Sequence, residues 1–199
     1  MFYNALKEEC PLQIDPFKAL IGPRPIGWIS SISKNGIANL APYSFFNAVS
    51  ANPPVIMFSS SGRKDSINNI ETTGEFVYNL ATAKLSAAVN ESSISVAPDV
   101  DEFELIGLEK MACQLINVPR VASSPVALEC KYLKTIELED LDNKKTGDLI
   151  VFGQVIGVHI DDNFIKEGRV RSDLLQPLAR HGYMDFSIVS ETFRIERPN

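Results

Sequence analysis

A group of hydrogen-bond donors lies between a short apolar run and an expected helix in the first half of the chain. Its members are Ser59, Ser60, Ser61, Arg63, Lys64 and Ser66. A helix N-terminus presents unpaired backbone N–H groups and the positive end of the helix dipole, so an anion is favoured there. Charge-assisted hydrogen bonds contribute about 1.5–3 kcal/mol each. The pattern indicates a phosphate site; the alternative is a solvated loop in which Asp65 or Ser66 caps the helix.

A second candidate segment, residues 41–54, places aromatic side chains between polar ones without the strict alternation of a half-buried strand. Its central residues are Tyr43, Ser44, Phe45, Phe46 and Asn47. Flat apolar faces, backbone N–H groups and the polar side chains of Ser44 and Asn47 suit a planar ligand. From this segment alone the other interpretation is favoured, in which the phenylalanines belong to the core and Asn47 to a turn.

The sequence has two histidines, His159 and His181. Neither stands in a cysteine or carboxylate pattern typical of metal ligands, so no metal ion is predicted. His181 lies beside Arg180 and Tyr183 in an expected loop, where functional groups tend to collect. A Gly-x-Ser-x-Gly elbow, a His-Glu-x-x-His helix and the glycine-rich fingerprints of P-loop and dinucleotide sites are all absent from the sequence.

These residues must be positioned by a fold that is mainly β. Strands are expected at residues 26–33, 55–61, 76–82, 126–140 and 148–160, with turns at 34–36 and 141–147. Residues 37–54 begin as a returning strand and then become irregular. Short helices are expected at 66–74, ended by Gly74, at 84–94, capped by Thr82, and just before Gly107. Because regular helices do not separate the long strands, an antiparallel barrel with peripheral helices is favoured over a doubly wound parallel sheet.

Composition narrows the classes of function. The 199 residues show no repeat or linker, so residues 1–199 are interpreted as a single domain. A net charge of −6 argues against nucleic acid as a main partner. The three cysteines, Cys10, Cys113 and Cys130, are widely spaced, which predicts reduced thiols in a cytoplasmic protein. No signal-like start and no apolar run of about 20 residues occurs, so no membrane partner is expected.

Several motifs resemble the flavin reductase-like family. Three runs carry the likeness in order: PRPIGWISSIS, NGIANLAPYSFFNAVSANPPVIMFSSS and RKDSINNIETTGEFVYNL. The later GLEKM, GQVIGVHI and PLARHGYMDF are similar to the family as well, so the likeness covers residues 21–186. It implies an antiparallel split β-barrel of Greek-key type, the FMN-binding split barrel, with FMN as cofactor. The aromatic PYSFFN, where many reductases have serine and threonine, favours a retained FMN.

Carried over by position, the resemblance gives each candidate residue a place. The FMN phosphate would be surrounded by Ser59, Ser60, Arg63, Lys64 and Ser66, with Ser61 beside them. The isoalloxazine edge would be followed by Tyr43, Ser44, Phe45, Phe46 and Asn47. Arg180 and Tyr183 match a C-terminal loop near the flavin, and His159 matches a histidine on a late barrel strand. His159, His181 and Tyr183 are therefore the catalytic candidates.

The resemblance implies an oxidoreductase in which NADH or NADPH donates hydride to flavin N5. The electrons would pass to an unknown acceptor, such as a separate protein or monooxygenase, and the family is usually homodimeric. Two alternatives stay open. One is a flavoredoxin-like FMN electron carrier without its own NAD(P)H turnover, and the other is a split barrel that serves as a binding module.

Overall fold

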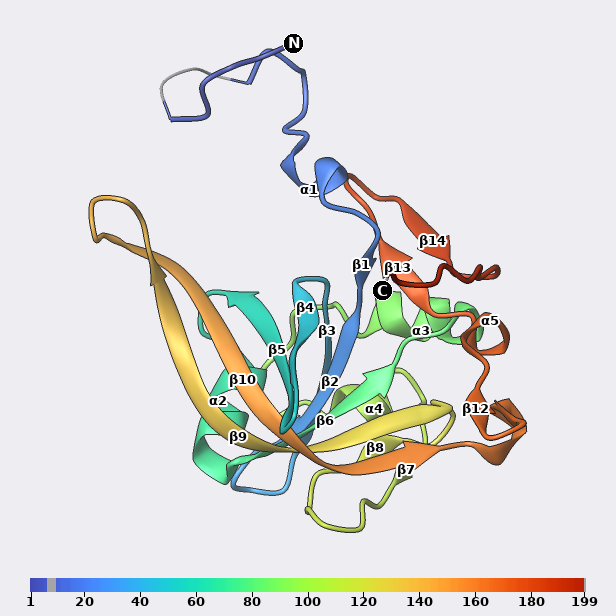
Figure 1. Ribbon diagram of the computed structural model, residues 1–199. Helices are drawn as coiled ribbons and strands as arrows, with labels where there is room; N and C mark the ends of the chain where they lie inside the picture. Colours follow the sequence, from blue (N-terminus) through green and yellow to red (C-terminus); the bar gives the residue numbers. More distant parts are fainter. Residues whose placement is uncertain (7–9, 199) are drawn as a thin grey trace.

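The structure, a computed structural model, describes residues 1–6 and 10–198 and contains one large antiparallel sheet (Figure 1). Its strands are β2 Gly27–Ile32, β3 Ala38–Tyr43, β4 Phe46–Ala51, β5 Pro54–Ser61, β6 Glu75–Leu80, β9 Val126–Glu139 and β10 Lys145–Ile160. Their order in space is β3-β2-β6-β9-β10-β5-β4. Strands β2 and β10 thus pair with β6 and β5, which are distant in sequence, as Greek-key connections require. The predicted mainly β, antiparallel fold is confirmed.

The large sheet is curled, so strands far apart in the hydrogen-bonded order share one core. The ring of Tyr43 on β3 lies 4.5 Å from that of Phe58 on β5, and Phe58 lies 6.0 Å from Phe76 on β6. Gly153 in β10 permits this packing, because a Cβ there would lie 2.2 Å from the Phe76 ring. Among the described residues no ladder joins β3 to β4, so the barrel is split between these edge strands.

Short helices lie between the strands. Helix α2, Asp65–Thr73, buries Ile67 and Ile70 in the core of Tyr43 and Phe58, and Gly74 ends it in the left-handed conformation, as predicted. The other helices are α1 Phe17–Leu20, η1 Ala83–Leu85, α3 Ser86–Glu91, α4 Glu102–Leu105, η2 Asp162–Phe164 and α5 Ser172–Leu175. None of the helices in the described part of the chain has the length and apolar character needed to cross a lipid bilayer.

Three smaller sheets complete the fold. The first joins segments from near the two chain ends: β1 Arg24–Pro25, β13 Leu178–Arg180 and β14 Phe186–Ile188, in the order β1-β13-β14. The other two are the pairs β7 Lys110–Met111 with β8 Arg120–Val121, and β11 Ile165–Lys166 with β12 Arg169–Val170. Figure 1 shows the first sheet beside α3, away from the β9–β10 hairpin loop.

Two predictions about local structure are wrong. Residues 46–51 are not irregular but form β4, because they pair with β5, for example Ala48 with Ile56. Pro42 is tolerated in β3 because this is an edge strand, which is hydrogen-bonded to a neighbour on one side only. The expected helix at residues 84–94 is divided into η1 and α3, and Thr82 precedes η1 without accepting a capping hydrogen bond.

The predicted cap of α2 is also wrong. The N-cap position belongs to Lys64, whose backbone is extended, and no side chain caps the helix. Asp65 is already the first helical residue. The buried Ser66 hydroxyl donates instead to Asn39 Oδ1 at 2.7 Å, so it is not available to the helix end.

Candidate functional site

Two adjoining cavities lie where β3, the start of α2 and the C-terminal sheet meet. The first, here called the α2 cavity, has a volume of about 390 Å³ and is lined by Asn39, Ala41, Pro42, Tyr43, Arg63, Lys64, Asp65, Ser66, residues 92–96 and Glu102. The second, the Arg180 cavity, has a volume of about 310 Å³ and is lined by Ile26, Pro42, Ser44, Val89, Asn90, Ser93, Arg180, Met184 and Phe186. Because Pro42 and Ser93 line both, the two cavities are neighbours.

The N-terminus of α2 opens into the α2 cavity without a side-chain cap. The first N–H groups of a helix have no partner within it, so they are available to a ligand there. Lys64 lines the same cavity and forms no ion pair among the described residues. Arg63 differs, because it binds Glu71 of α2 at 2.5 Å. That contact raises the pKa of Arg63 and lowers that of Glu71.

Tyr43 lines the same cavity and carries a buried hydroxyl. The side chain is buried, and its Oη makes no hydrogen bond of ordinary geometry, although the Ser60 and Ser66 hydroxyls lie near it. Burial raises the pKa of Tyr43, so the phenol keeps its proton. A buried O–H without an acceptor costs about 1–3 kcal/mol, which a ligand oxygen would remove. Together with Lys64 and the uncapped helix, this donor set fits a phosphate.

A buried polar network supports this wall. Ser66 binds Asn39, and Asn39 Nδ2 donates to Glu102 Oε1 at 2.6 Å. Burial raises the pKa of Glu102, with smaller opposing effects from its hydrogen bonds. The network joins α2, β3 and α4 and so fixes the position of Ser66 beside the cavity.

The three serines of β5 have other partners. Ser60 donates to the Gly62 carbonyl at 2.9 Å, and Ser61 donates to Asp148 Oδ1 at 2.6 Å. Ser59 donates its backbone N–H to the Phe45 carbonyl at 2.8 Å. None of the three lines the α2 cavity or the Arg180 cavity. The structure therefore brings Lys64, Arg63 and Ser66 to the cavity and leaves the β5 serines beside it.

The aromatic segment is divided between the cavities and the core. Ser44 lines the Arg180 cavity, as Tyr43 lines the α2 cavity. Phe46 stacks on Tyr78 at 4.8 Å, with the rings 4° from parallel, so it is a core residue. Phe45 is 39% exposed, and Asn47 is exposed with its Oδ1 accepting the Ala48 N–H. These three side chains line neither cavity in the isolated chain.

The C-terminal candidates meet at the sheet β1-β13-β14. Arg180 lines its cavity, lies 4.3 Å from the Phe186 ring centroid and donates to the Tyr183 carbonyl at 2.7 Å. Arg24 is its cross-strand neighbour and is buried. Burial, and then the charge of Arg180, lower the pKa of Arg24. An anionic ligand would offset this concentration of positive charge.

The histidines lie outside the two cavities. His181 Nε2 is 2.7 Å from the Ser187 hydroxyl, and the ring does not line the Arg180 cavity. Tyr183 is 48% exposed and has a left-handed backbone with φ 57°. His159, on β10, contacts Glu129 and lines a different cavity. Their catalytic roles stay predictions.

Residues 22–179 match the family model of the flavin reductase like domain. The chain belongs to this family. A solved structure of nitrilotriacetate monooxygenase component B from Bacillus cereus is similar to it, with 30% identity, 98% of each chain covered and a TM-score of 0.87. The 2-nitrobenzoate 2-nitroreductase NbaA of Pseudomonas fluorescens has 29% identity and a TM-score of 0.81 over 92% of this chain and 88% of its own.

Flavoredoxin of Desulfovibrio vulgaris (Miyazaki F) shares the fold of this flavin reductase-like chain. Its identity is 17%, with a TM-score of 0.76 over 98% of this chain and 97% of that one. The resemblance predicted from the PYSFFN and GRKDS segments is therefore confirmed, and so is the split-barrel fold.

Sequence reasoning about this flavin reductase-like chain missed part of the α2 cavity. Asn39, Glu102 and residues 92–96 line it, although they come from β3, α4 and the segment after α3. Among these residues, only the serine-rich run ESSIS at residues 91–95 gave a visible signal. The pairing of Asn39 with Glu102 across 63 positions of sequence had no local signature.

Proposed function

We propose that this protein is an FMN-binding oxidoreductase that uses NADH or NADPH as hydride donor and passes electrons to a separate acceptor. The observation that carries the proposal is the α2 cavity, where the unpartnered Tyr43 hydroxyl, the uncapped α2 and Lys64 converge. The adjoining Arg180 cavity offers space for a ring beyond the phosphate end. The family to which the chain belongs supports a flavin as the ligand.

In this proposal the α2 cavity holds the phosphate. Lys64 and the α2 backbone N–H groups bind its oxygens, Tyr43 donates its phenolic proton in a hydrogen bond, and Arg63 adds charge at the rim. Ser44 and Arg180 lie toward the ring, where Arg180 would stabilise negative charge. When bound, FMN supplies the hydride-accepting chemistry at N5, and the chain supplies position and electrostatics. The reaction needs no protein nucleophile.

Anaerobic reduction of the purified protein tests this function. We expect a yellow protein whose flavin absorbance is bleached by NADH or NADPH in the absence of oxygen. A yellow protein that dithionite bleaches but NAD(P)H does not would favour the flavoredoxin-like carrier. A protein that stays colourless after FMN is added would contradict both flavin functions and leave only a binding module.

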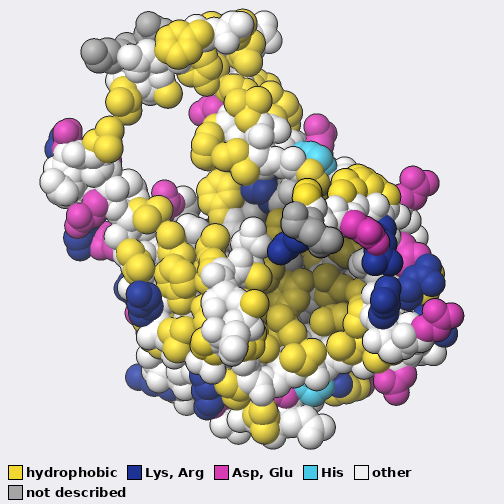
Figure 2. Space-filling model, in the orientation of Figure 1, with side chains coloured by type: hydrophobic (Ala, Val, Ile, Leu, Met, Phe, Trp, Pro, Cys, Tyr) yellow, Lys and Arg dark blue, Asp and Glu magenta, His cyan; other side chains and the backbone are white. Residues whose placement is uncertain are grey.

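We further propose a homodimer with a separate electron acceptor. Figure 2 shows a face rich in hydrophobic side chains, with a hollow whose walls are apolar. Exposed apolar residues of the large sheet are Val49 on β4, Leu133, Ile136 and Leu138 on β9, and Ile156 and Val158 on β10. Such a surface is typical of an interface. Light scattering should give twice the mass of 22.0 kDa, and the mass of a single chain would contradict the dimer.

The nature of the acceptor is suggested by a similar protein. The Bacillus cereus structure is a component B of a monooxygenase, which by that name works with another component. We propose a comparable partner for this chain. Oxidation of NAD(P)H that continues with free flavin as sole acceptor would instead mean that no protein acceptor is required.

A further inference from the structure

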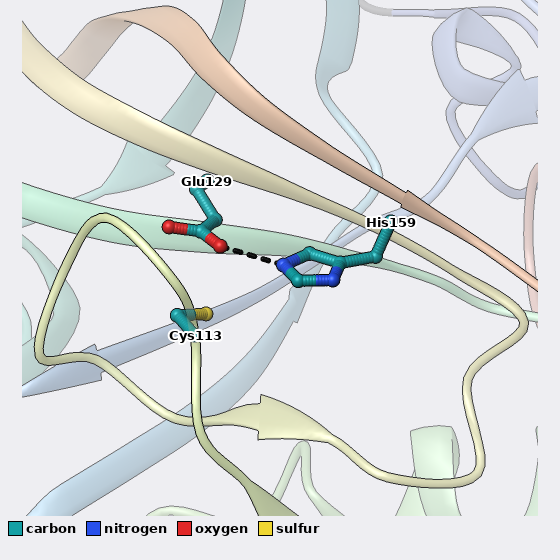
Figure 3. Close-up of side chains that lie close together, drawn as sticks. All are labelled: Cys113, Glu129 and His159. Carbon is teal, nitrogen blue, oxygen red and sulfur yellow. Dashed lines mark hydrogen bonds and ion pairs between the residues drawn. The ribbon is translucent and has the colours of Figure 1, made fainter.

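Three side chains of different chemistry converge away from the α2 and Arg180 cavities. They are Cys113, between β7 and β8, Glu129 on β9 and His159 on β10, and Figure 3 shows them facing one another. Their potential donor atoms, one sulfur, one carboxylate oxygen and one ring nitrogen, all lie within 4.8 Å of one another. His159 Nε2 is 2.6 Å from Glu129 Oε1.

Glu129 is the buried centre of this cluster, with 1% of its surface exposed. It accepts the backbone N–H groups of Gln114 and Leu115, each at 2.8 Å. Burial would raise its pKa, but the Gln114 N–H, His159 and the Leu115 N–H outweigh burial, so the pKa is lowered and the carboxylate is ionised. Gly157 leaves room for it, since a Cβ there would lie 3.2 Å from Glu129 Cδ.

These contacts also fix Cys113. The loop that carries it is held to Glu129 through the next two residues, so its thiol stays near the carboxylate. Burial, and then the charge of Glu129, raise the pKa of Cys113 to about 12. Without a cation the group is therefore an inert thiol beside a buried anion. A bound divalent cation would reverse this balance, because a coordinating thiol is deprotonated.

The cluster is open to solvent on one side. His159 lines a cavity of about 520 Å³ together with Arg120, Asp161, residues 122–125 and its β10 neighbours Val158 and Ile160. An ion at the cluster could thus keep one coordination position toward this cavity.

We propose that Cys113, Glu129 and His159 bind one zinc ion per chain. One thiolate, one imidazole and one carboxylate suit Zn²⁺, which commonly takes three protein ligands and leaves a fourth position open. On binding, the thiol loses its proton to solvent and sulfur bonds the ion. The imidazole moves its proton to Nδ1 and binds through Nε2, in place of its hydrogen bond to Glu129. The two backbone N–H groups continue to hold the carboxylate as outer-shell donors.

Cobalt substitution tests the site in the flavin-loaded, untagged protein after chelator treatment. Co²⁺ should bind at one equivalent per chain and add a thiolate-to-cobalt charge-transfer band to the difference spectrum, which Zn²⁺ removes by competition. Cys113→Ser should abolish the band, whereas Cys10→Ser, a matched change at another half-buried thiol, should leave it. A band that survives in Cys113→Ser, or no saturable binding, would overturn the proposal.

Two further measurements use the wild-type chain, in case Cys113→Ser does not fold. X-ray absorption of the zinc-loaded protein should show one sulfur at about 2.3 Å together with nitrogen and oxygen neighbours. Zinc binding in weakly buffered solution should release about one proton per ion, from the Cys113 thiol. A coordination shell without sulfur would contradict the assignment.

Discussion

Among the residues that line the α2 cavity, the two adjacent cations are not equivalent. Arg63 is already engaged by Glu71, while Lys64 forms no ion pair in the described part of the chain and marks the N-terminus of α2. A ligand anion must compete with Glu71 for Arg63 but not for Lys64. The Tyr43 hydroxyl differs from both cations. It is buried away from water and donates no hydrogen bond to a protein acceptor.

Changing both cations to alanine should weaken FMN binding at least tenfold, about 1.4 kcal/mol. Lys64→Ala alone should account for most of that loss, because its charge is not neutralised by a carboxylate. Flavin titration followed by fluorescence measures the dissociation constants. Lys144→Ala, on the exposed β9–β10 loop, is the control. A larger loss in Arg63→Ala than in Lys64→Ala would contradict this ranking.

Tyr43→Phe should have opposite effects on stability and on binding. In the flavin-free protein the free energy of unfolding should rise by about 1 kcal/mol, because an unsatisfied buried hydroxyl is removed. FMN affinity should fall by about fivefold, because the phosphate loses a donor. Denaturant unfolding and flavin titration measure the two quantities. Loss of stability without loss of affinity would mean that the hydroxyl has a structural acceptor.

At the scale of elements, the cavities depend on how the sheet is curled. The α2 cavity lies beside β3, which contacts β5 through core side chains such as Tyr43 and Phe58. The curl of the sheet requires a position in β10 without a side chain, and Gly153 provides it. At Gly153 the register between β10 and β9 also shifts. Such irregularities increase the local twist of a sheet.

Gly153→Ala should lower the free energy of unfolding by about 1–3 kcal/mol, because the new methyl group would overlap the Phe76 ring. Adding Phe76→Leu should recover part of the loss, since a smaller side chain makes room for it. Urea unfolding of the four proteins of this double-mutant cycle measures the coupling. Additive effects of the two changes would show that the residues do not contact each other in solution.

The pH dependence of stability contains a contribution from Glu75, which joins β6 to Lys131 of β9 at 2.5 Å and to the Asn117 N–H. Burial would raise the pKa of Glu75, but Lys131 and the Asn117 N–H outweigh it, so the folded pKa is lowered. A carboxyl group whose pKa is lower in the folded state than in the unfolded state stabilises the fold at pH values above its unfolded pKa, which is near 4.3. That stabilisation is lost as the pH falls through the pKa of the folded state.

The difference in unfolding free energy between wild type and Glu75→Gln should therefore be largest at about pH 6 and shrink below about pH 4. Urea unfolding at a series of pH values measures it. Glu91→Gln, at an exposed position, should show little difference at any pH. If the difference in unfolding free energy between wild type and Glu75→Gln grew as the pH was lowered, the predicted direction of the pH dependence would be wrong.

For the whole molecule, the sequence predicted what depends on local pattern and on family likeness. The long strands, the Gly74 stop of α2 and the split-barrel fold were predictable from apolar runs, turn residues and ordered motifs. Strand β4 was not, because its stability comes from pairing with β5 rather than from alternation. The same limit concealed the cluster of Cys113, Glu129 and His159. The β9–β10 pairing brings Glu129 close to His159, and the Gln114 and Leu115 N–H groups hold the loop of Cys113 to Glu129.

In the candidate site, too, local pattern predicted some features and contacts between distant segments decided others. Lys64 and Tyr43 were found from residue type and motif, and the structure adds why they differ from their neighbours. The serines of β5 carried the right chemistry, but their strand gives them partners in Gly62 and Asp148. Residue type therefore gave the candidate residues, while hydrogen bonding between distant segments decided which of them line the two cavities.

One wall of the Arg180 cavity is formed by the C-terminal part of the sheet β1-β13-β14. Arg180, Met184 and Phe186 belong to the last part of the chain, which is held to the body by two-residue β1 and short ladders. A ligand in this cavity and the attachment of the C-terminal tail are therefore thermodynamically linked. Whatever occupies the cavity should shield the tail from proteases, and trimming the tail should speed the ligand's escape.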